Sequence, residues 1–207
     1  MNKFKISSNS AFTKLYDSSE FLKYSSDDMI SNIKSNSNQG IGHFLFCYGS
    51  NSIEQIKNRL NIKKKIDVKK AYLPNHIRIF AGHSKKWNGG TATVIKTDED
   101  YYVKGTIIYL SETELEKLDK FEGANKNTNP FSKIDNIYRR KYVKVKDPND
   151  NYILCIIYVK NKKDWISYPS NEYLNAVKKN ISEYWPELDA SNQMYIYDKD
   201  LVLKGMY

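Results

Sequence analysis

The length of the chain fits one domain, and its composition excludes several classes of protein. It has 207 residues, 40% of them hydrophobic and 14% aromatic, which is enough to bury one ordinary core. No apolar run approaches the roughly 18 residues of a membrane-spanning helix. The first residues do not resemble a secretory signal. We therefore expect a cytoplasmic protein with no membrane partner.

The formal net charge of +9 raises the question of an anionic partner. The basic runs, at 63–65, 69–70 and 162–163, are short and scattered. Aromatic residues do not interleave with them as a base-stacking surface requires. We expect solvated lysines and no nucleic-acid partner, with an anionic partner as the alternative.

Residues 1–40 hold ten serines and five asparagines and show weak apolar periodicity. Such a segment buries too little apolar surface to offset its ordering entropy, so we predict an N-terminal extension. A short amphipathic helix over 10–24, docked on the main domain, is the alternative. The main domain is predicted over 41–185, and 186–207 forms a C-terminal tail.

From residue 42 onward, strand-like runs bounded by turn residues alternate with a few helical patterns. Six strands with three helices predict an α+β fold whose sheet closes into a barrel, not a doubly wound sheet. The predicted strands are 43–47, 70–80, 91–96, 102–110, 137–146 and 152–159, and the predicted helices are 53–60, 112–121 and 171–184.

The first motif that could take part in binding or catalysis is FLFCYGSN at 44–51. It is an apolar strand that ends abruptly before a helix. Asn51 is predicted as the N-cap of that helix, with Glu54 completing a capping box. The junction leaves backbone N–H groups without helical partners, where an anion or a developing oxyanion can bind. The same pattern is also typical of a capped turn without a ligand.

The motif GTIIYLSETELEKLDKFEG, at 105–123, predicts a strand followed by a helix that a Ser111–Glu114 capping box starts and Gly123 ends. Glu122 then lies at the helix C-terminus, where the helix dipole disfavours a carboxylate. The dipole, with partial burial beside Phe121, should raise its pKa and make it a stronger base. A solvated surface glutamate is the alternative.

Two shorter motifs frame a possible pocket. In WNGGTATV, at 87–94, paired glycines allow close backbone approach or a bend at a barrel corner, and Trp87 can cover a pocket. The motif taken alone favours a bulge with a surface tryptophan. In SYPSNEY, at 167–173, a turn and N-cap open a helix that carries Tyr173.

Other types of site are not indicated. The three histidines and two cysteines lack metal-ligand spacing, and no phosphate-binding or dinucleotide-binding glycine loop occurs. Cys47 and Cys155 lie in apolar strand-like runs, which favours reduced thiols, with one disulfide as the alternative. We expect neither a metal nor a cofactor.

Taken in order, these blocks resemble the γ-glutamylcyclotransferase (AIG2-like) family from about residue 44 to residue 184. The resemblance implies a small mixed six-stranded β-barrel flanked by helices, with a cavity at one barrel end. It also implies that Glu122 is the catalytic acid/base and that the first loop and a later tyrosine bind substrate. The implied binding residues are Leu45, Phe46, Cys47, Tyr48, Gly49, Ser50, Asn51 and Tyr173.

The resemblance implies that the α-amine of a small γ-glutamyl compound attacks its own γ-carbonyl and releases 5-oxoproline. A γ-glutamyl amino acid is the expected substrate, and the enzyme is expected as a monomer or homodimer. A glutathione-specific or γ-glutamylamine-specific cyclotransferase would use the same residues with another leaving group. A non-catalytic barrel that binds an anionic partner is the alternative from another class.

Overall fold

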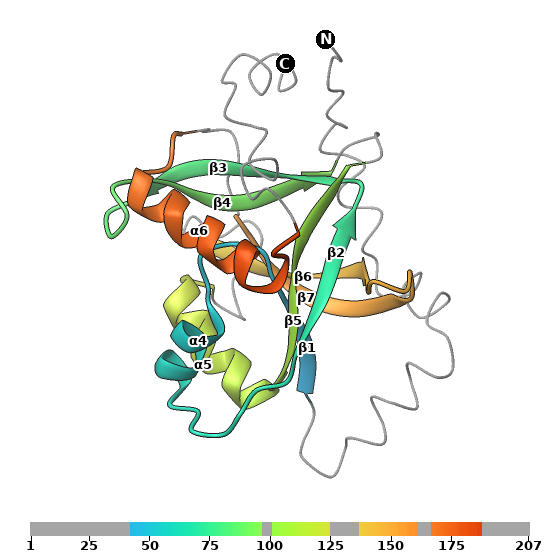
Figure 1. The fold of residues 1–207 in the computed structure, drawn as a ribbon. Coiled ribbons are helices and arrows are strands. Elements are labelled where there is room, and N and C mark those ends of the chain that lie inside the picture. The colour runs from blue at the N-terminus through green and yellow to red at the C-terminus, as the bar shows by residue number, and fades with distance from the viewer. Residues whose placement is uncertain (1–41, 97–100, 125–136, 161–166, 188–207) are drawn as a thin grey trace.

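The computed structural model describes residues 42–96, 101–124, 137–160 and 167–187 (Figure 1). The predicted extension, its alternative helix and the tail from residue 188 onward lie outside these residues. The elements are, in chain order, β1 (Gly42–Cys47), α4 (Ile53–Leu60), β2 (Val68–Pro74), β3 (His76–Ser84), β4 (Gly89–Lys96), β5 (Tyr102–Ser111), α5 (Glu112–Glu122), β6 (Tyr138–Lys146), β7 (Tyr152–Lys160) and α6 (Asn171–Tyr184).

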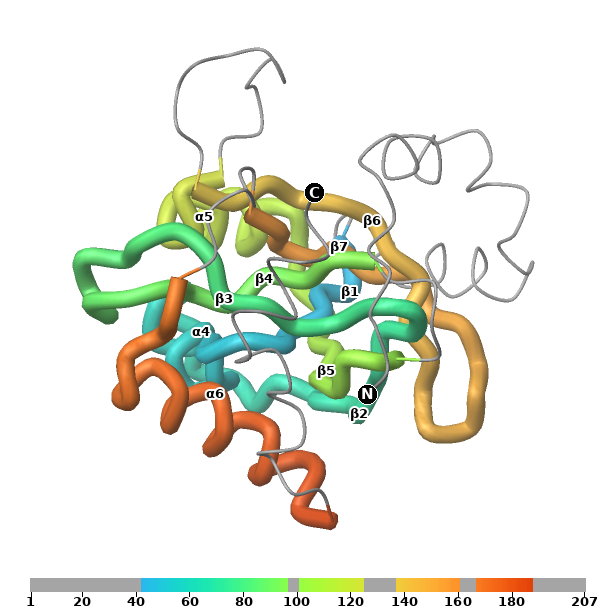
Figure 2. The backbone as a smooth tube through the Cα atoms, turned by 90° about the horizontal axis from the view of Figure 1, so that it is seen from above, coloured from blue at the N-terminus to red at the C-terminus, as the bar shows by residue number. Residues whose placement is uncertain are grey.

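The fold is α+β with a mixed set of strands, as expected, but the six-stranded barrel is wrong. Seven strands are described, and five of them form a closed barrel in the order β1-β5-β2-β6-β7. The barrel closes through a parallel pairing of β1 with β7, at Leu45 and Ile156, whereas its other pairings are antiparallel. The hairpin β3–β4 lies across one end of the barrel (Figure 1, Figure 2).

The error comes from the run at 70–80, which was predicted as one strand and forms two. Pro74 ends β2, and Asn75 adopts a left-handed conformation with φ of 55°. Asparagine tolerates this region because its short polar side chain can compensate the backbone locally. The chain turns there, so β3 leaves the barrel and, among the described strands, pairs only with β4.

Neighbouring residues of the barrel strands face two separate cores, because successive side chains point to opposite faces of a strand. Leu45 belongs to the core under α4 and α5, and Phe46 belongs to the core shared with the hairpin and α6. No helix within the described ranges is both long and apolar enough to cross a membrane. The helix residues buried in these cores are Ile56 and Leu60 of α4, Leu115 and Leu118 of α5, and Tyr173, Val177 and Ile181 of α6.

The ends of α5 match the prediction in detail. Ser111 accepts a hydrogen bond from the backbone of Glu114, whose side chain in turn accepts from the backbone of Ser111. Gly123 ends the helix with φ of 61°, a conformation that costs a residue with a Cβ about 1–2 kcal/mol. The helix is therefore fixed at both ends, and Glu122 is its last residue.

Candidate active site

The residues predicted to form the site lie around one cavity of about 490 Å³. The cavity forms where the loop after β1, the C-terminal end of α5, the β3–β4 hairpin and the first turn of α6 meet. The structure brings all nine predicted residues to it: Leu45, Phe46, Cys47, Tyr48, Gly49, Ser50, Asn51, Glu122 and Tyr173.

Two side chains of other elements hold the Glu122 carboxylate by one oxygen. Asn51 Nδ2 and an Arg59 guanidinium nitrogen each donate a hydrogen bond of 2.9 Å to Glu122 Oε1. Among the described residues, none donates a hydrogen bond to Oε2. One oxygen of the carboxylate is therefore anchored, and the other is available to a ligand in the cavity.

Asn51 does not cap α4, contrary to the prediction. Ser52 is the N-cap, and its hydroxyl accepts a 3.0 Å hydrogen bond from the backbone of Gln55. The N-cap thus lies one residue later than predicted, which frees the Asn51 amide to contact Glu122 and Arg59. Its Oδ1 accepts a 3.1 Å hydrogen bond from Arg59, and its Nδ2 donates to Glu122.

The pKa of Glu122 is raised, mainly because burial disfavours the charged carboxylate. The hydrogen bonds from Asn51 and Arg59 and the charge of Arg59 lower this pKa but do not cancel the effect of burial. The sequence-based reason was only partly right, because Phe121 is 55% exposed and does not shield the carboxylate. The Glu122 side chain itself is only 10% exposed.

The loop after β1 is oriented by hydrogen bonds to two of its carbonyl groups. Arg78 Nε donates to the carbonyl of Tyr48, and Asn180 Nδ2 donates to the carbonyl of Gly49, each at 2.9 Å. A trans peptide places its N–H opposite its C=O. The N–H groups of Gly49 and Ser50 therefore point away from Arg78 and Asn180.

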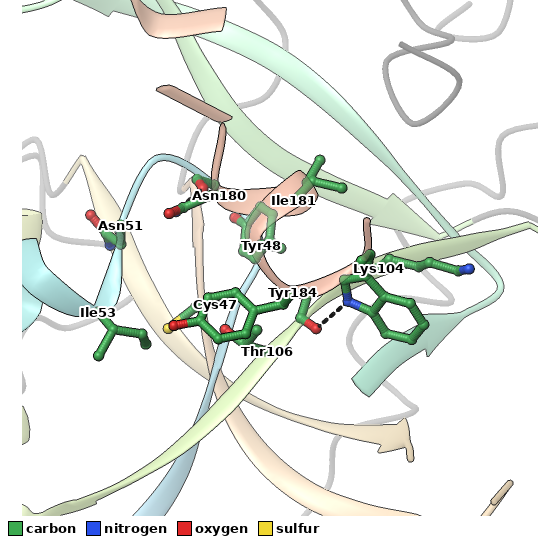
Figure 3. A pocket seen from close by; sticks show the side chains of 12 residues that line it. Cys47, Tyr48, Asn51, Ile53, Lys104, Thr106, Asn180, Ile181 and Tyr184 are labelled. Atoms are coloured by element: carbon green, nitrogen blue, oxygen red, sulfur yellow. Dashed lines mark hydrogen bonds between the residues drawn. The ribbon is translucent and has the colours of Figure 1, made fainter. Parts of the chain in front are cut away.

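A second, much smaller cavity lies on the Asn180 side of this loop (Figure 3). Its volume is about 10 Å³, and its lining includes Lys104, Asn180 and Tyr184. This is about the space that one water molecule needs. It is too small for a substrate, so the larger cavity is the candidate site.

Tyr173 reaches the cavity because the segment before α6 packs closely on the hairpin. Gly90 donates a 2.8 Å backbone hydrogen bond to Tyr168, and a Cβ at Gly89 would lie 2.7 Å from the backbone nitrogen of Ser170. The prediction that these glycines allow close backbone approach is confirmed. The Tyr173 hydroxyl then accepts a 2.9 Å hydrogen bond from the backbone of Ala92.

Aromatic side chains form much of the cavity wall. The rings of Trp87 and Tyr173 lie at a centroid distance of 5.1 Å, and both residues line the cavity. Of the two interpretations of Trp87, the structure agrees with the one in which it covers a pocket. Burial raises the pKa values of Tyr48, Tyr138 and Tyr173. These phenols stay neutral at physiological pH and serve as hydrogen-bonding groups, not as bases.

An ion pair fixes the end of α5 to the barrel behind the cavity. Arg140 of β6 donates two hydrogen bonds, of 2.8 and 2.7 Å, to the two carboxylate oxygens of Asp119. Tyr158 of β7 donates a further 2.8 Å hydrogen bond to Asp119. Because Asp119 lies one helical turn before Glu122, this pair restrains the position of the candidate base.

The sequence did not identify Arg59 or Lys160 as site residues. Arg59 meets Glu122 only because α4 packs beside α5, and no motif links two residues so far apart in the chain. Lys160 follows an apolar strand and has the pattern of a solvated strand end, yet it is 5% exposed and lines the cavity. Within the described part of the chain, no group of three or more histidine, cysteine, aspartate and glutamate side chains could hold a metal ion.

The sequence matches the family described as gamma-glutamyl cyclotransferase, AIG2-like, over residues 45–175. The chain belongs to this family. The match includes the loop after β1, Glu122 and Tyr173, and it ends within α6. None of the curated proteins matches the chain.

Several solved structures share the fold. A protein named gamma-glutamyl cyclotransferase is 24% identical, with a TM-score of 0.60 over 73% of this chain and 84% of that one. An uncharacterized human protein is 22% identical, with a TM-score of 0.62 over 80% of this chain and 99% of that one. YkqA from Bacillus subtilis is 17% identical, with a TM-score of 0.56 over 78% of this chain and 56% of that one.

Proposed function

We propose that this protein is a γ-glutamyl cyclotransferase that releases 5-oxoproline and a free amino acid from γ-glutamyl amino acids. The observation that carries the proposal is the half-anchored carboxylate of Glu122 at the wall of a 490 Å³ cavity. A base needs a fixed position and a free oxygen, and the contacts of Glu122 satisfy both requirements. Membership of the family supports the reaction class.

In the proposed reaction, Glu122 Oε2 accepts a proton from the α-ammonium of the substrate, whose pKa in water is about 8. The neutral nitrogen attacks the γ-carbonyl carbon and forms a five-membered tetrahedral intermediate. Glu122 then returns the proton to the leaving nitrogen as the old C–N bond breaks. The former α-nitrogen gives up a second proton through Glu122 to the released amine, which leaves the neutral lactam 5-oxoproline and an ammonium on the released amino acid. The raised pKa of Glu122 helps it to work in both directions.

The loop after β1 suits the oxyanion of this intermediate. The contact of Arg78 turns the N–H group of Gly49 away from Arg78, and the contact of Asn180 turns the N–H group of Ser50 away from the small cavity. Fixed N–H groups that face a developing negative charge stabilise a transition state without reorganising. We assign these two groups to the oxyanion.

The cavity suits a dipeptide, because small-molecule sites usually enclose about 300–1,000 Å³. The nucleophile and the electrophile belong to the same molecule, so the cavity has only to fold the substrate for the reaction to proceed. This proposal requires no metal and no cofactor.

The test compares wild type with Glu122→Gln on γ-glutamyl-alanine, glutathione and γ-glutamyl-lysine, with 5-oxoproline measured by chromatography. Wild type should turn over at least γ-glutamyl-alanine. Glu122→Gln should lose about 100-fold or more in kcat, the contribution of a general base. Glu116→Gln, at an exposed position of the same helix, is the matched control and should keep its rate.

Two results would contradict the proposal in different ways. If wild type forms no 5-oxoproline from any of the three substrates, the proposed activity is wrong. If wild type is active and Glu122→Gln is equally fast, the activity stands and the assignment of the base is wrong.

A further inference from the structure

Lys160 occupies an unusual position at the wall of the candidate site. It is the last residue of β7, pairs with Tyr138 of β6, and is 5% exposed. Its ammonium lies 5.3 Å from the ring centroid of Tyr138, and a Cβ at Gly82 would lie 2.9 Å from Nζ. These contacts place the ammonium beside β3, on the hairpin side of the cavity.

No acidic side chain among the described residues forms an ion pair with Lys160. Burial lowers its pKa to about 8, and no neighbouring charge contributes to the shift. Most of the lysine is still charged at neutral pH. A buried ammonium without a counter-ion is costly, so an anionic ligand would stabilise it considerably.

The hairpin side of the cavity is cationic beyond this one residue. Lys85 and Lys86 line the same cavity, and Lys86 lies 5.1 Å from the ring centroid of Trp87. Among the described residues that line the cavity, Glu122 is the one acidic residue, and it forms an ion pair with Arg59. The positive charge that remains for a ligand is therefore on the hairpin side.

Lys160 and Glu122 face different parts of the cavity. Glu122 Oε1 accepts hydrogen bonds from Asn51 and Arg59, on the α4 side of the cavity. Lys160 Nζ instead lies beside Gly82 of β3 and the ring of Tyr138. Among the described residues, no ion pair joins Lys160 to Glu122. The cavity thus has a proton-accepting end and a separate anion-binding end.

We propose that Lys160 binds a carboxylate of the leaving group, which makes the substrates γ-glutamyl amino acids or peptides and not γ-glutamylamines. This inference rests on the proposed function. The glutamyl half must place its ammonium at Glu122 and its γ-carbonyl at the loop after β1. The α-carboxylate of the glutamyl half is on the same carbon as that ammonium, so it stays near Glu122. The carboxylate of the leaving amino acid lies beyond the γ-carbonyl, and we assign this second carboxylate to Lys160.

The test uses two substrates that differ in a single group, γ-glutamyl-alanine and γ-glutamyl-alaninamide. The amide replaces the carboxylate of the leaving group with a neutral group of nearly the same size. A hydrogen bond to a charged group contributes about 1.5–3 kcal/mol, so wild type should prefer the acid by about 10-fold to 100-fold in kcat/KM. The difference should appear mainly in KM.

Variants then assign the preference to Lys160. Lys160→Gln should raise KM for γ-glutamyl-alanine about tenfold or more and bring the acid-to-amide ratio close to one. Lys160→Arg keeps the charge and should keep most of the preference. Lys179→Met removes an exposed lysine of α6 that does not line the cavity, and it should retain the wild-type ratio.

Three outcomes overturn this inference. The first is that the wild-type enzyme has the same kcat/KM for the acid and the amide. This result can be obtained without any variant, and it leaves the proposed function intact. The second is an equal rise in KM for both substrates in Lys160→Gln, which would assign Lys160 to the glutamyl half. The third is no 5-oxoproline from either substrate, which would overturn the proposed function as well.

Discussion

At the scale of single residues, the environment of Glu122 combines opposing effects. Burial raises the pKa of its carboxyl group, while Asn51 and Arg59 lower it. Arg59 also lies 5.5 Å from the ring centroid of Phe121, so this exposed ring helps to hold the guanidinium against the carboxylate. Burial makes the carboxylate a stronger base, and Asn51 and Arg59 moderate this effect.

Replacement of Arg59 should change the pH dependence of the reaction. Arg59 lowers the pKa of Glu122, so Arg59→Met should raise that pKa further. A base works only when ionised, and the acidic limb of kcat/KM should therefore move to higher pH. Activity should recover at alkaline pH, unlike that of Glu122→Gln.

The measurement is the pH profile of 5-oxoproline formation between pH 5 and pH 9. Lys57→Met, on the same helix and away from the cavity lining, is the control and should leave the profile in place. An Arg59→Met enzyme with an unshifted acidic limb would show that Arg59 does not tune the base.

At the scale of elements, α5 delivers Glu122 because both of its ends are fixed. The capping box at Ser111 sets the first turn, and the left-handed Gly123 stops the helix directly after Glu122. Leu115 and Leu118 are fully buried between these ends and fix the rotation of the helix. One extra turn, or a different rotation, would take the carboxylate out of the cavity.

Gly123 therefore offers a test of how the end of the helix supports the site. Gly123→Ala should lose about 1–2 kcal/mol of unfolding free energy, because φ of 61° is strained for alanine. Gly123→Asn should lose less, since asparagine tolerates this conformation. The measurement is urea denaturation together with kcat.

A Cβ at residue 123 would lie 3.4 Å from the side chain of Ile137, so both variants make this contact and differ mainly in backbone strain. Equal stability of the two variants would therefore contradict the assignment of the loss to the left-handed conformation.

At the scale of the whole molecule, the ion pair of Asp119 and Arg140 joins α5 to the barrel. Arg140 also donates a 3.0 Å hydrogen bond to Glu112, which His43 approaches at 3.2 Å. Both ends of α5 are thus bound to β6 through one guanidinium. Removal of one partner from a largely buried pair leaves a charge without compensation.

We expect Asp119→Asn to lose about 3–5 kcal/mol of unfolding free energy, the usual cost of breaking a buried ion pair. Glu112→Gln should lose much less, since the Glu112 side chain is 26% exposed against 7% for Asp119. Urea denaturation measures both. Should the two losses be equal, the buried pair would have no special role.

A double replacement separates the charge from the packing. Asp119→Leu combined with Arg140→Met should be more stable than Asp119→Asn, because it removes both charges of the buried pair. Glu112 loses Arg140 in this variant, but its side chain is 26% exposed and keeps His43 at 3.2 Å.

Local physical chemistry determined much of this protein from the sequence alone. Hydrophobic periodicity predicted the three helices, and turn chemistry predicted the capping box and Gly123, since these depend on neighbours in the chain. Helix chemistry also marked Glu122 as an unusual carboxylate. The assignment of Glu122 as the base remains a prediction until the variant is measured.

Only the tertiary structure decided the features that depend on distant partners. The turn at Asn75 places β3 outside the barrel. Because Ser52 is the N-cap of α4, the Asn51 side chain can bind Glu122 instead of capping the helix. Arg59 and Lys160 became parts of one cavity because α4 packs beside α5 and β7 ends beneath the hairpin. These contacts depend on packing between elements that are far apart in the chain. A short sequence pattern cannot predict them, because it describes only neighbouring residues.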